Sequence, residues 1–545
     1  MTGSGSVGGE RKSGSAWAPL RRRTFRTLWT AQLGSNVGTW MQTVGAQWML
    51  VRQPHAAALT SAVQAASLLP VLFLSLPGGV LADVVNRKTM LVWLAASMAA
   101  VCGALTALTS AGLATPAVLL ALTFLLGCGQ ALMNPAWQAI QPELVPREEI
   151  PAASALGSLN VNAARAVGPA VAGLLIAVAG TRVVFGLNAL SFVGICFAVA
   201  TWRRQSTTVG EAEHMRPALA AGTRYVRAAP GVRRILLRAA LFVVPASALW
   251  GLLPVVARVR LGLGSGGYGL LLGALGVGAV AGAAFMKPAT AALGRNRLLA
   301  LSSLVFAAGG AAAVWLTQPV AVAVVLVPTG VGWLWALSTF NTALQLTLPA
   351  WVRARGLAVY LIVFMGGQGV GSLLWGAVAA WLTPTGGVVI ASALLALTTA
   401  TLASWPLPAS LGTLDREVVA PWPEPSLVLD PDPDDGPVVV EVVYLLDGER
   451  EPAFLEAMTA VERSRRRTGA LRWTLLRDSE DVSRWVEVFE VASWSEHLRQ
   501  HTSRTTGADA EAMRTAADLS RTPPQVRHLV PARTPTPVMA SMVAE

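Results

Sequence analysis

The fold is decided by a short charged stretch, Gly79-Val-Leu-Ala-Asp-Val-Val-Asn-Arg-Lys-Thr-Met-Leu91, which lies between two long apolar segments. Each flanking segment is long enough for a helix to cross the hydrocarbon core of a bilayer, which takes about 20 residues. An acid and two bases in so short a loop indicate two membrane helices that turn back on each other and pack within a bundle. The stretch therefore predicts a polytopic membrane protein.

The composition supports a membrane protein without any motif. Mean hydropathy is +0.53, 53% of the residues are hydrophobic and only 13% are charged, whereas soluble domains carry roughly 25% charged residues. Apolar runs of roughly 20 residues recur about twelve times between about residue 25 and about residue 406. We therefore expect an all-α membrane domain of about twelve transmembrane helices in two six-helix halves.

The net charge of +12 could suggest nucleic-acid binding, but its distribution argues against this. The arginines cluster in the N-terminal tail and in alternate loops, as in Arg21–Arg23, Arg203, Arg204, Arg233 and Arg234. This is the bias of cytoplasmic loops in membrane proteins. It predicts a cytoplasmic (inner) bacterial membrane protein with both termini in the cytoplasm, and no nucleic-acid partner.

The charged stretch resembles the loop signature between the second and third spans of the major facilitator superfamily, Gly-x-Leu-Ala-Asp-x-x-Gly-Arg-Lys. The match covers Gly79, Leu81, Ala82, Asp83, Arg87 and Lys88. It departs at Val84, where an Arg is usual, and at Asn86, where a Gly is usual. We expect Asn86 to preserve the turn because Asn tolerates left-handed backbone.

The resemblance implies a conformational gate at this loop. Its members are Gly79, Asp83, Arg87, Lys88, Glu143 and Arg355. The Asp83 carboxylate would meet the N-terminal end of the eleventh span near Arg355, where a helix dipole favours negative charge. Arg87 and Glu143 would form a neighbouring ion pair. The alternative is that Asp83 serves only topology.

Further motifs resemble the branch that contains the bacterial enterobactin exporter and the transmembrane secretion effectors. They are the opening of the first span from Phe25, the Asn134-Pro135 pair and the stretch from Arg165 to Gly173. Small residues let helices approach closely and Pro bends a span. The expected helix-packing residues, from this stretch and its counterpart in the second half, are Gly168, Pro169, Gly173, Gly371 and Gly376.

Polar side chains recur at helical spacing along several spans. The superfamily resemblance places spans one, four, seven and ten around a central cavity. The candidate cavity residues are Gln32, Asn36, Trp40, Gln47, Gln130, Asn134, Asn162, Arg165, Asn341, Gln345 and Gln368. The alternative is that these amides link helices by hydrogen bonds.

Arg165 has two interpretations, because a charge in the middle of a span must be paired or face water. It could attract an anion in the cavity, or it could lock the bend at Gly168 by bonding carbonyls or Asn162. No Asp or Glu occurs between His214 and Leu414. We therefore expect a neutral or anionic small-molecule substrate, and proton coupling through Asp83, Glu143 or the substrate itself.

The residues after about Pro406 form a different kind of segment. An acidic, Pro-rich linker precedes a β-α-β-β-α-α-β pattern that fits a ferredoxin-like α+β domain and resembles the antibiotic-biosynthesis-monooxygenase-like domains. That resemblance implies a homodimer formed through this domain. His497, His501 and His528 lack Cys or acid partners at metal spacing, so no metal site is expected. The basic run from Arg463 to Arg467 either faces anionic headgroups or only solvates its helix.

The expected domains are a cytoplasmic N-terminal tail, two six-helix halves separated by a cytoplasmic loop, a linker, a soluble domain and a tail. Their boundaries are 1–24, 25–202, 203–233, 234–406, 407–437, 438–533 and 534–545. The expected function is secondary active export of a siderophore-like or other secondary metabolite or drug, by alternating access in the lipid bilayer, coupled to protons. No cofactor and no enzymatic activity are expected. Two alternatives remain: a membrane-tethered enzyme with a catalytic C-terminal domain, and a non-transporting metabolite sensor.

Overall fold

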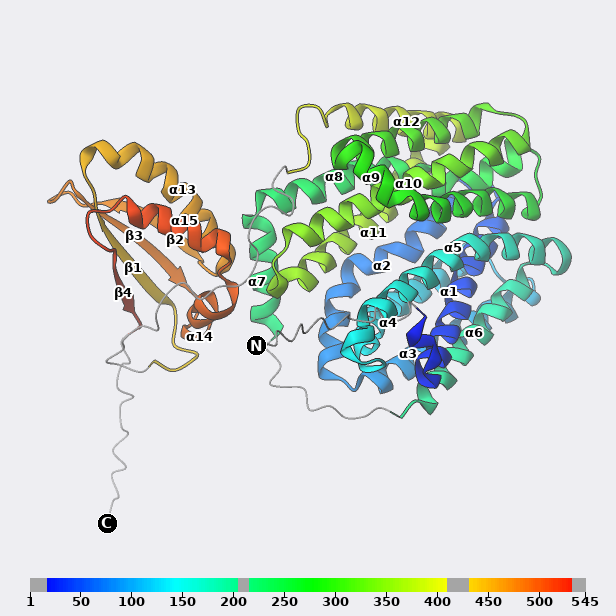
Figure 1. The fold of residues 1–545 in the computed structure, drawn as a ribbon. Helices are drawn as coiled ribbons and strands as arrows, with labels where there is room; N and C mark the ends of the chain where they lie inside the picture. The colour runs from blue at the N-terminus through cyan, green and yellow to red at the C-terminus, as the bar shows by residue number, and fades with distance from the viewer. Residues whose placement is uncertain (1–16, 204–214, 409–430, 532–545) are drawn as a thin grey trace, which may run out of the picture. The chain divides into compact units, whose positions relative to one another are not determined.

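The computed structural model describes residues 17–203, 215–408 and 431–531. These residues form two compact units (Figure 1). The first comprises the described residues within Met1–Ala212, Leu236–Asn341 and Tyr360–Leu407. The second comprises those within Glu213–Ile235, Thr342–Val359 and Pro408–Glu545. Each unit is described by itself.

The first half of the membrane domain consists of long apolar helices. They are α1 (Arg23–Leu50), α2 (Ala56–Val84), α3 (Arg87–Ser110), α4 (Pro116–Ile140), α5 (Ile150–Ala179) and α6 (Thr181–Thr201). Short η helices occupy Ala18–Arg21, Gln141–Glu143 and Arg147–Glu149. Helix α1 packs on α5 and α6, α2 packs on α4, and α3 packs on α6. A buried cluster around Leu91, Met98 and Phe192 joins α3 to α6.

The second half repeats long helices with one kink. Its elements are α8 (Pro230–Val255), η4 (Val256–Arg260), α9 (Ser265–Trp315), α10 (Pro319–Thr347), α11 (Ala350–Trp381) and α12 (Pro384–Ala400). Helix α9 has 51 residues, but Gly294 within it is non-helical, with φ 70° and ψ 166°. A straight helix of that length would be far longer than the roughly 30 Å hydrocarbon core. The left-handed Gly294 therefore separates two helical segments.

Within the described residues, nine helical stretches are long and apolar enough to cross a membrane. Helix α9 counts once among them although Gly294 divides it, and α12 has 17 residues and counts as a shorter apolar helix. The chain is thus a mostly helical, multi-pass membrane protein.

The turn between α2 and α3 is tighter than expected and uses Asn86 differently. Asn86 has φ −57° and ψ 113°, so its backbone is not left-handed. Its side-chain oxygen accepts hydrogen bonds from the backbone N–H groups of Lys88 and Thr89 at 3.0 and 3.4 Å. This is the N-cap role that Asn performs well. The turn is therefore kept, as expected, but Asn86 keeps it by capping α3 and not by a left-handed backbone.

The second unit contains a four-stranded antiparallel sheet in the order β2-β3-β1-β4. The strands are β1 (Val438–Leu445), β2 (Arg472–Arg477), β3 (Arg484–Val491) and β4 (Gln525–Leu529). The helices are α7 (Met215–Ala228), α13 (Glu451–Thr468), α14 (Trp494–Arg499), η6 (Gln500–Arg504) and α15 (Gly507–Asp518), and η5 spans Gly448–Arg450. Alternate residues of β1 and β3 are buried. Their apolar side chains pack with Phe454 and Met458 of α13 and Met513 of α15, so these helices cover one sheet face.

The basic run of α13 is largely occupied by ion pairs. Arg465 is buried, and its Nε lies 2.9 Å from Oε1 of the fully buried Glu487. Arg466 pairs with Glu462 at 2.8 Å. Arg467 pairs with Asp509 at 2.6 Å. The two predicted roles of this run, headgroup binding and simple solvation, were thus wrong for Arg465, which stabilises the core.

Candidate functional site

A cavity of about 560 Å³ lies within the first unit. It is lined by α1, α4, α5 and α10, which belong to both halves of the membrane domain. The expected cavity residues in its wall are Gln32, Asn36, Asn134, Asn162, Arg165 and Asn341. The cavity extends from Arg165 to Phe25, Leu144 and Ala153, at the ends of their spans. No carboxylate is among its described lining residues.

Amide side chains connect α1 to α5 along one side of the cavity. Asn36 donates from Nδ2 to Oδ1 of Asn160 at 2.8 Å, and Asn160 donates to the Trp29 carbonyl at 2.9 Å. Gln32 donates to Asn36 at 3.2 Å. Asn36 therefore both lines the cavity and links helices, so the cavity interpretation and the helix-linking interpretation both apply to this residue. The sequence analysis missed Asn160, although an Asn in an apolar span is itself a signal of internal bonding.

Arg165 contributes the cationic group of the cavity wall. Its guanidinium lies 5.7 Å from the centre of the Trp40 ring. Its buried Nε and Nη1 atoms have no hydrogen-bond partner among the described residues. Asn162 donates to the Ser158 carbonyl at 2.9 Å. The bonds that would make Arg165 a structural lock are therefore not formed at these two nitrogen atoms.

The remaining expected cavity residues lie outside this wall. Trp40 lies beside Arg165, whose guanidinium is 5.7 Å from the centre of its ring, and Gln130 donates to Asn134 at 3.3 Å. Gln47 is buried, accepts from the Tyr268 hydroxyl at 2.6 Å and donates to the Trp250 carbonyl at 3.2 Å. Gln368 is also buried, while Gln345 belongs to the second unit and is exposed. Gln47 thus links helices, contrary to the expectation that it faces the cavity.

The two halves meet closely at the end of the spans away from Phe25 and Leu144. A Cβ added at Gly173 of α5 would lie 2.6 Å from the Ser265 carbonyl oxygen and 2.9 Å from Cα of Gly269, both on α9. A Cβ at Gly376 of α11 would lie 2.6 Å from Cβ of Ser61 on α2. Only glycine permits such backbone approach.

Two other expected packing positions also lie at close helix contacts. A Cβ at Gly168 would lie 2.7 Å from Cβ of Trp40, and one at Gly371 would lie 2.7 Å from the Val244 carbonyl oxygen. Pro169, beside Gly168, is buried within α5. The Trp250 ring packs against two other tryptophans. Its centre lies 6.0 Å from that of Trp40 and 5.3 Å from that of Trp333.

The expected gate loop lies at the opposite end from these contacts. Arg87 and Glu143 form the expected ion pair, with Nη1 and Oε1 3.0 Å apart. A Cβ at Gly79 would meet nothing within 4 Å, and Lys88 is half-buried in the first turn of α3. The side chain of Asp83 lies outside the described residues, and so does its expected contact with Arg355. Arg355 itself packs against Gly222 of α7 in the second unit.

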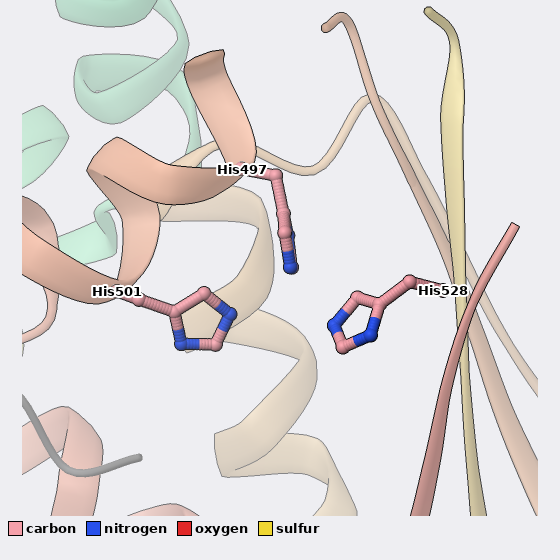
Figure 2. Close-up of side chains that lie close together, drawn as sticks. All are labelled: His497, His501 and His528. Carbon is pink, nitrogen blue, oxygen red and sulfur yellow. The ribbon is translucent and has the colours of Figure 1, made fainter. Parts of the chain in front are cut away.

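A second group of polar side chains lies in the second unit. The rings of His497, His501 and His528 face one another (Figure 2), and one ligand nitrogen from each lies within 4.8 Å of the other two. Burial lowers the pKa of His497 to about 2 and that of His501 to about 4. All three are therefore neutral at pH 7. The sequence analysis considered only Cys and acid partners for these histidines, and their approach to one another was not predicted.

Comparisons with known proteins agree with a transporter fold. The sequence pattern of the family described as transmembrane secretion effector matches residues 14–536. The staphyloferrin A transporter of Staphylococcus aureus is 30% identical over 165 residues, which are 30% of this chain and 40% of that protein. The enterobactin exporter of Salmonella typhimurium is 30% identical over 315 residues, 56% of this chain and 74% of that protein. The crystal structure of a D-xylose–proton symporter shares the fold, with a TM-score of 0.57 and 14% identity over 71% of this chain and 98% of that one.

The family match covers most of the chain, and the relatives and the solved structure are transporters and not enzymes. The chain therefore belongs to the transmembrane secretion effectors, a family of multi-pass transporters of the major facilitator superfamily.

Proposed function

We propose that this protein is a secondary active exporter of a neutral or anionic small molecule. The observation that carries the proposal is the cavity that holds Arg165 with two unpartnered, buried guanidinium nitrogens and no carboxylate in its described wall. An unsatisfied buried donor costs roughly 1–3 kcal/mol, and more when it is charged. A substrate carboxylate or phenolate that accepted bonds from Arg165 would offset that cost. A cationic drug would meet only repulsion there.

The transport cycle proposed is alternating access of two six-helix halves, twelve spans in all. Counting the two segments of α9 separately, and counting α1 and α12, supports this number. The cavity reaches the end of the spans that carries Arg22, Arg87 and Glu143. The arginine bias supports a cytoplasmic location for that end. The conformation described would then be open to the cytoplasm and closed by the small-residue contacts at the other side.

Proton coupling is proposed to involve the gate loop and not the cavity. The sequence from His214 to Leu414 contains no Asp or Glu, so that half offers no intramembrane carboxylate for a proton relay. Asp83 and Glu143 are the remaining candidates, with Glu143 held by Arg87. The alternative carrier is the substrate itself, bound protonated or deprotonated.

The proposed substrate class is a siderophore-like or other secondary metabolite or drug. Two relatives carry names that refer to enterobactin and staphyloferrin A. The size of the cavity, about 560 Å³, lies within the range of about 300–1,000 Å³ typical of small-molecule sites. The described wall combines Trp29 and Trp137 with amides, which suits a ligand with both ring and polar groups.

The C-terminal segment is proposed to be a ferredoxin-like domain, similar to the antibiotic-biosynthesis-monooxygenase-like domains, that pairs two copies of the protein. The sheet face away from α13 and α15 supports pairing, because it carries half-buried residues such as Val439, Val443, Val486 and Val488. The same face also carries Glu441, Arg484 and Glu490, so its apolar part is a row of valines, which association with a second copy would cover.

A comparison of secreted and intracellular metabolites tests the export proposal. A strain that lacks the gene would be complemented with wild type, Arg165→Gln, Arg165→Lys or Arg52→Gln. Arg52 is an exposed arginine in the turn after α1 and serves as the matched control. In the deletion strain we expect one compound to disappear from the medium and to accumulate in cells. Wild type and Arg52→Gln should restore its export. Rescue by Arg165→Gln should be at least about tenfold weaker, since a loss of about 1.4 kcal/mol in binding corresponds to tenfold.

Other outcomes separate the alternatives. An unchanged metabolite profile would overturn export. Full rescue by Arg165→Gln would remove Arg165 from substrate binding and leave export standing. A compound that binds the purified protein but shows no flux in proteoliposomes would identify a metabolite sensor.

A further inference from the structure

The histidine cluster in the second unit is built from two consecutive helical elements and one strand that is distant from them in the sequence. His497 belongs to α14, His501 to the π-helix η6 and His528 to strand β4. The ring centres of His497 and His501 are 4.6 Å apart, and those of His497 and His528 are 4.8 Å apart. Figure 2 shows the three rings directed into the space between the helix and the strand.

Local structure explains why the rings converge. His497 and His501 are four residues apart, so a helix presents them on one face. The chain changes there from an α-helix to a π-helix. The backbone N–H of Thr505 donates to the Gln500 carbonyl at 3.2 Å, five residues earlier. Single π turns of this kind occur frequently at functional sites. His528 is paired with Val440 in the sheet register, and Val440 is buried beneath the helices, so His528 lies on the same covered face.

His497 has polar atoms that the described protein does not satisfy. Its side chain is fully buried, and neither Nδ1 nor Nε2 has a hydrogen-bond partner among the described residues. The Oε1 atom of the neighbouring buried Gln500 is also without a partner. A buried polar group left unsatisfied costs about 1–3 kcal/mol. Contact of the ring with Trp494, with centres 5.3 Å apart, fills space but satisfies neither nitrogen.

We propose that His497, His501 and His528 form a binding site for a divalent transition-metal ion. Imidazole nitrogens suit borderline ions such as Zn²⁺, Co²⁺, Ni²⁺ and Cu²⁺, and three of them make a recognised ligand set for Zn²⁺. No carboxylate or thiol joins the cluster within the part of the chain that the structure describes, which disfavours Mg²⁺ and Ca²⁺. The proposal does not depend on what the membrane domain transports.

The geometry requires only a modest closure. Zn–N bonds of about 2.0–2.1 Å place two tetrahedral ligand nitrogens about 3.4 Å apart. The nitrogens now lie within 4.8 Å of one another, so the longest separation must shorten by about 1.4 Å. The half-buried His501 and His528 side chains would have to rotate to close this distance. Three protein ligands leave one position of a tetrahedral ion for water or a small exchangeable molecule.

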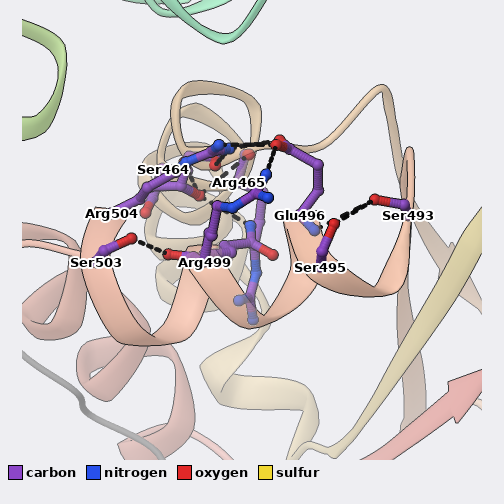
Figure 3. A network of polar contacts seen from close by, with 10 residues as sticks. Ser464, Arg465, Ser493, Ser495, Glu496, Arg499, Ser503 and Arg504 are labelled. Atoms are coloured by element: carbon purple, nitrogen blue, oxygen red, sulfur yellow. Dashed lines mark hydrogen bonds and ion pairs between the residues drawn. The ribbon is translucent and has the colours of Figure 1, made fainter. Parts of the chain in front are cut away.

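The helix that carries two of the histidines is held in place by ion pairs. Arg504 donates from Nη1 and Nη2 to the two carboxylate oxygens of Glu496 at 2.6 and 2.9 Å. Arg499 bonds the same carboxylate at 2.6 Å, and Ser503 bonds the Arg499 carbonyl at 3.0 Å (Figure 3). These bonds fix α14 and η6 before any metal binds. Such support around the ligands strengthens a metal site.

The charge near the cluster does not prevent cation binding. After burial, the neighbouring cationic Arg465 is one of the causes that lower the pKa values of His497 and His501. Its charge is offset by the buried Glu487, whose Oε1 lies 2.9 Å from Nε.

The direct test is metal titration of the full-length protein in detergent. The protein must be purified without a polyhistidine tag and freed of metal by chelator and dialysis. Zn²⁺ affinity is then measured by competition with a chromophoric chelator, and Co²⁺ is added to record its visible d–d absorption. We expect one Zn²⁺ per chain, and a Co²⁺ spectrum of four-coordinate intensity.

Variants assign that ion to the cluster. His501→Gln and His528→Gln change half-buried ligands, and His55→Gln changes an exposed histidine outside the cluster as the matched control. Loss of a second-shell partner alone weakens metal binding about 10–100-fold, so loss of a ligand should weaken it at least about 100-fold. The control should bind like wild type, and near-UV circular dichroism should show that each variant is folded.

Two results would overturn the proposal. One is that the wild-type protein binds no more metal ion than a variant in which all three histidines are replaced. The other is a folded His501→Gln variant with wild-type affinity, since the ion would then lie elsewhere.

Discussion

The contact between Gly173 of α5 and Gly269 of α9 should control which conformation the transporter prefers. The two glycines approach so closely that a Cβ on either would collide with the other helix. Helix α5 belongs to the first half of the membrane domain and α9 to the second. In an alternating-access cycle, this contact would form when the end of the spans that carries Gly173 is closed. It would break when that end opens. We therefore expect Gly173→Ala to destabilise the conformation described here.

The magnitude follows from the distances. The alanine Cβ would lie 2.6 Å from the Ser265 carbonyl oxygen, whereas ordinary contact begins at 3.4 Å. The helices must therefore separate by about 0.8 Å, or the backbone must deform. Overpacking of this kind typically costs about 1–3 kcal/mol. If this cost falls only on the conformation that is closed at the Gly173 end, the equilibrium shifts about 5- to 150-fold toward the conformation that is open at that end.

Cysteine alkylation measures that shift. The reporter is Ser61→Cys, because Ser61 is fully buried at the contact between α2 and α11 near the same end of the spans. The background replaces Cys102, Cys128 and Cys196 with Ala. We expect a membrane-impermeant maleimide to label the reporter at least about five times faster in the Gly173→Ala protein.

Gly194→Ala is the matched control, because Gly194 also lies within a helix but a Cβ there meets nothing within 4 Å. It should leave the labelling rate unchanged. An unchanged rate in both variants would refute the reasoning, because it would mean that α5 and α9 accommodate the methyl group without separating. Equal acceleration in both would show that loss of glycine, and not the collision, is the cause.

Four further results are expected. Asp83→Asn should lower export far more than membrane abundance, because the expected gate contact biases one conformation; normal flux would remove Asp83 from the mechanism. Glu487→Gln should destabilise the C-terminal segment by about 3–5 kcal/mol by leaving a buried arginine unpaired, whereas Glu462→Gln at an exposed pair should cost under about 1 kcal/mol in a thermal unfolding assay. Burial alone would raise the pKa of Asp509, but the ion pair with Arg467 and the hydrogen bonds from Thr506 and Ser464 together outweigh burial and lower that pKa. Stability should therefore fall as the pH drops below about 4, and this slope should weaken in Asp509→Asn. Val488→Lys on the open sheet face should convert a dimer in light scattering to a monomer, and a wild-type monomer would contradict pairing.

Much of the membrane domain could be predicted from the sequence because bilayer length and charge placement are strong local signals. The ion pair of Arg87 with Glu143 followed from a loop motif, and the structure confirms it at 3.0 Å. The cavity residues were harder, because helical spacing identifies a face but not what the face meets. Gln47 shares a stripe with Asn36, yet it bonds Tyr268 and the Trp250 carbonyl at the closed end.

The histidine cluster shows where single-sequence reasoning stops. The spacing of His497 and His501 was visible, since four residues place two side chains on one helical face. His528 lies 27 residues after His501 on a strand, and only the register with β1 brings it beneath the helix. Metal-site patterns in sequence depend on short spacings, so a ligand supplied by sheet pairing gives no such signal.

Two arginines in apolar surroundings show that partners, and not burial alone, decide the role of a charge. In β3 the buried positions alternate, and Glu487 occupies one of them between Trp485 and Phe489. An acid at a core position of a strand requires a partner, and Arg465 meets it at 2.9 Å while Tyr444 and Trp473 donate to it at 3.1 and 2.9 Å. That arginine has its charge partner within the protein. Arg165 has the same side chain, yet two of its nitrogens stay without partners beside a cavity, so its remaining bonds are available to a ligand that enters that cavity.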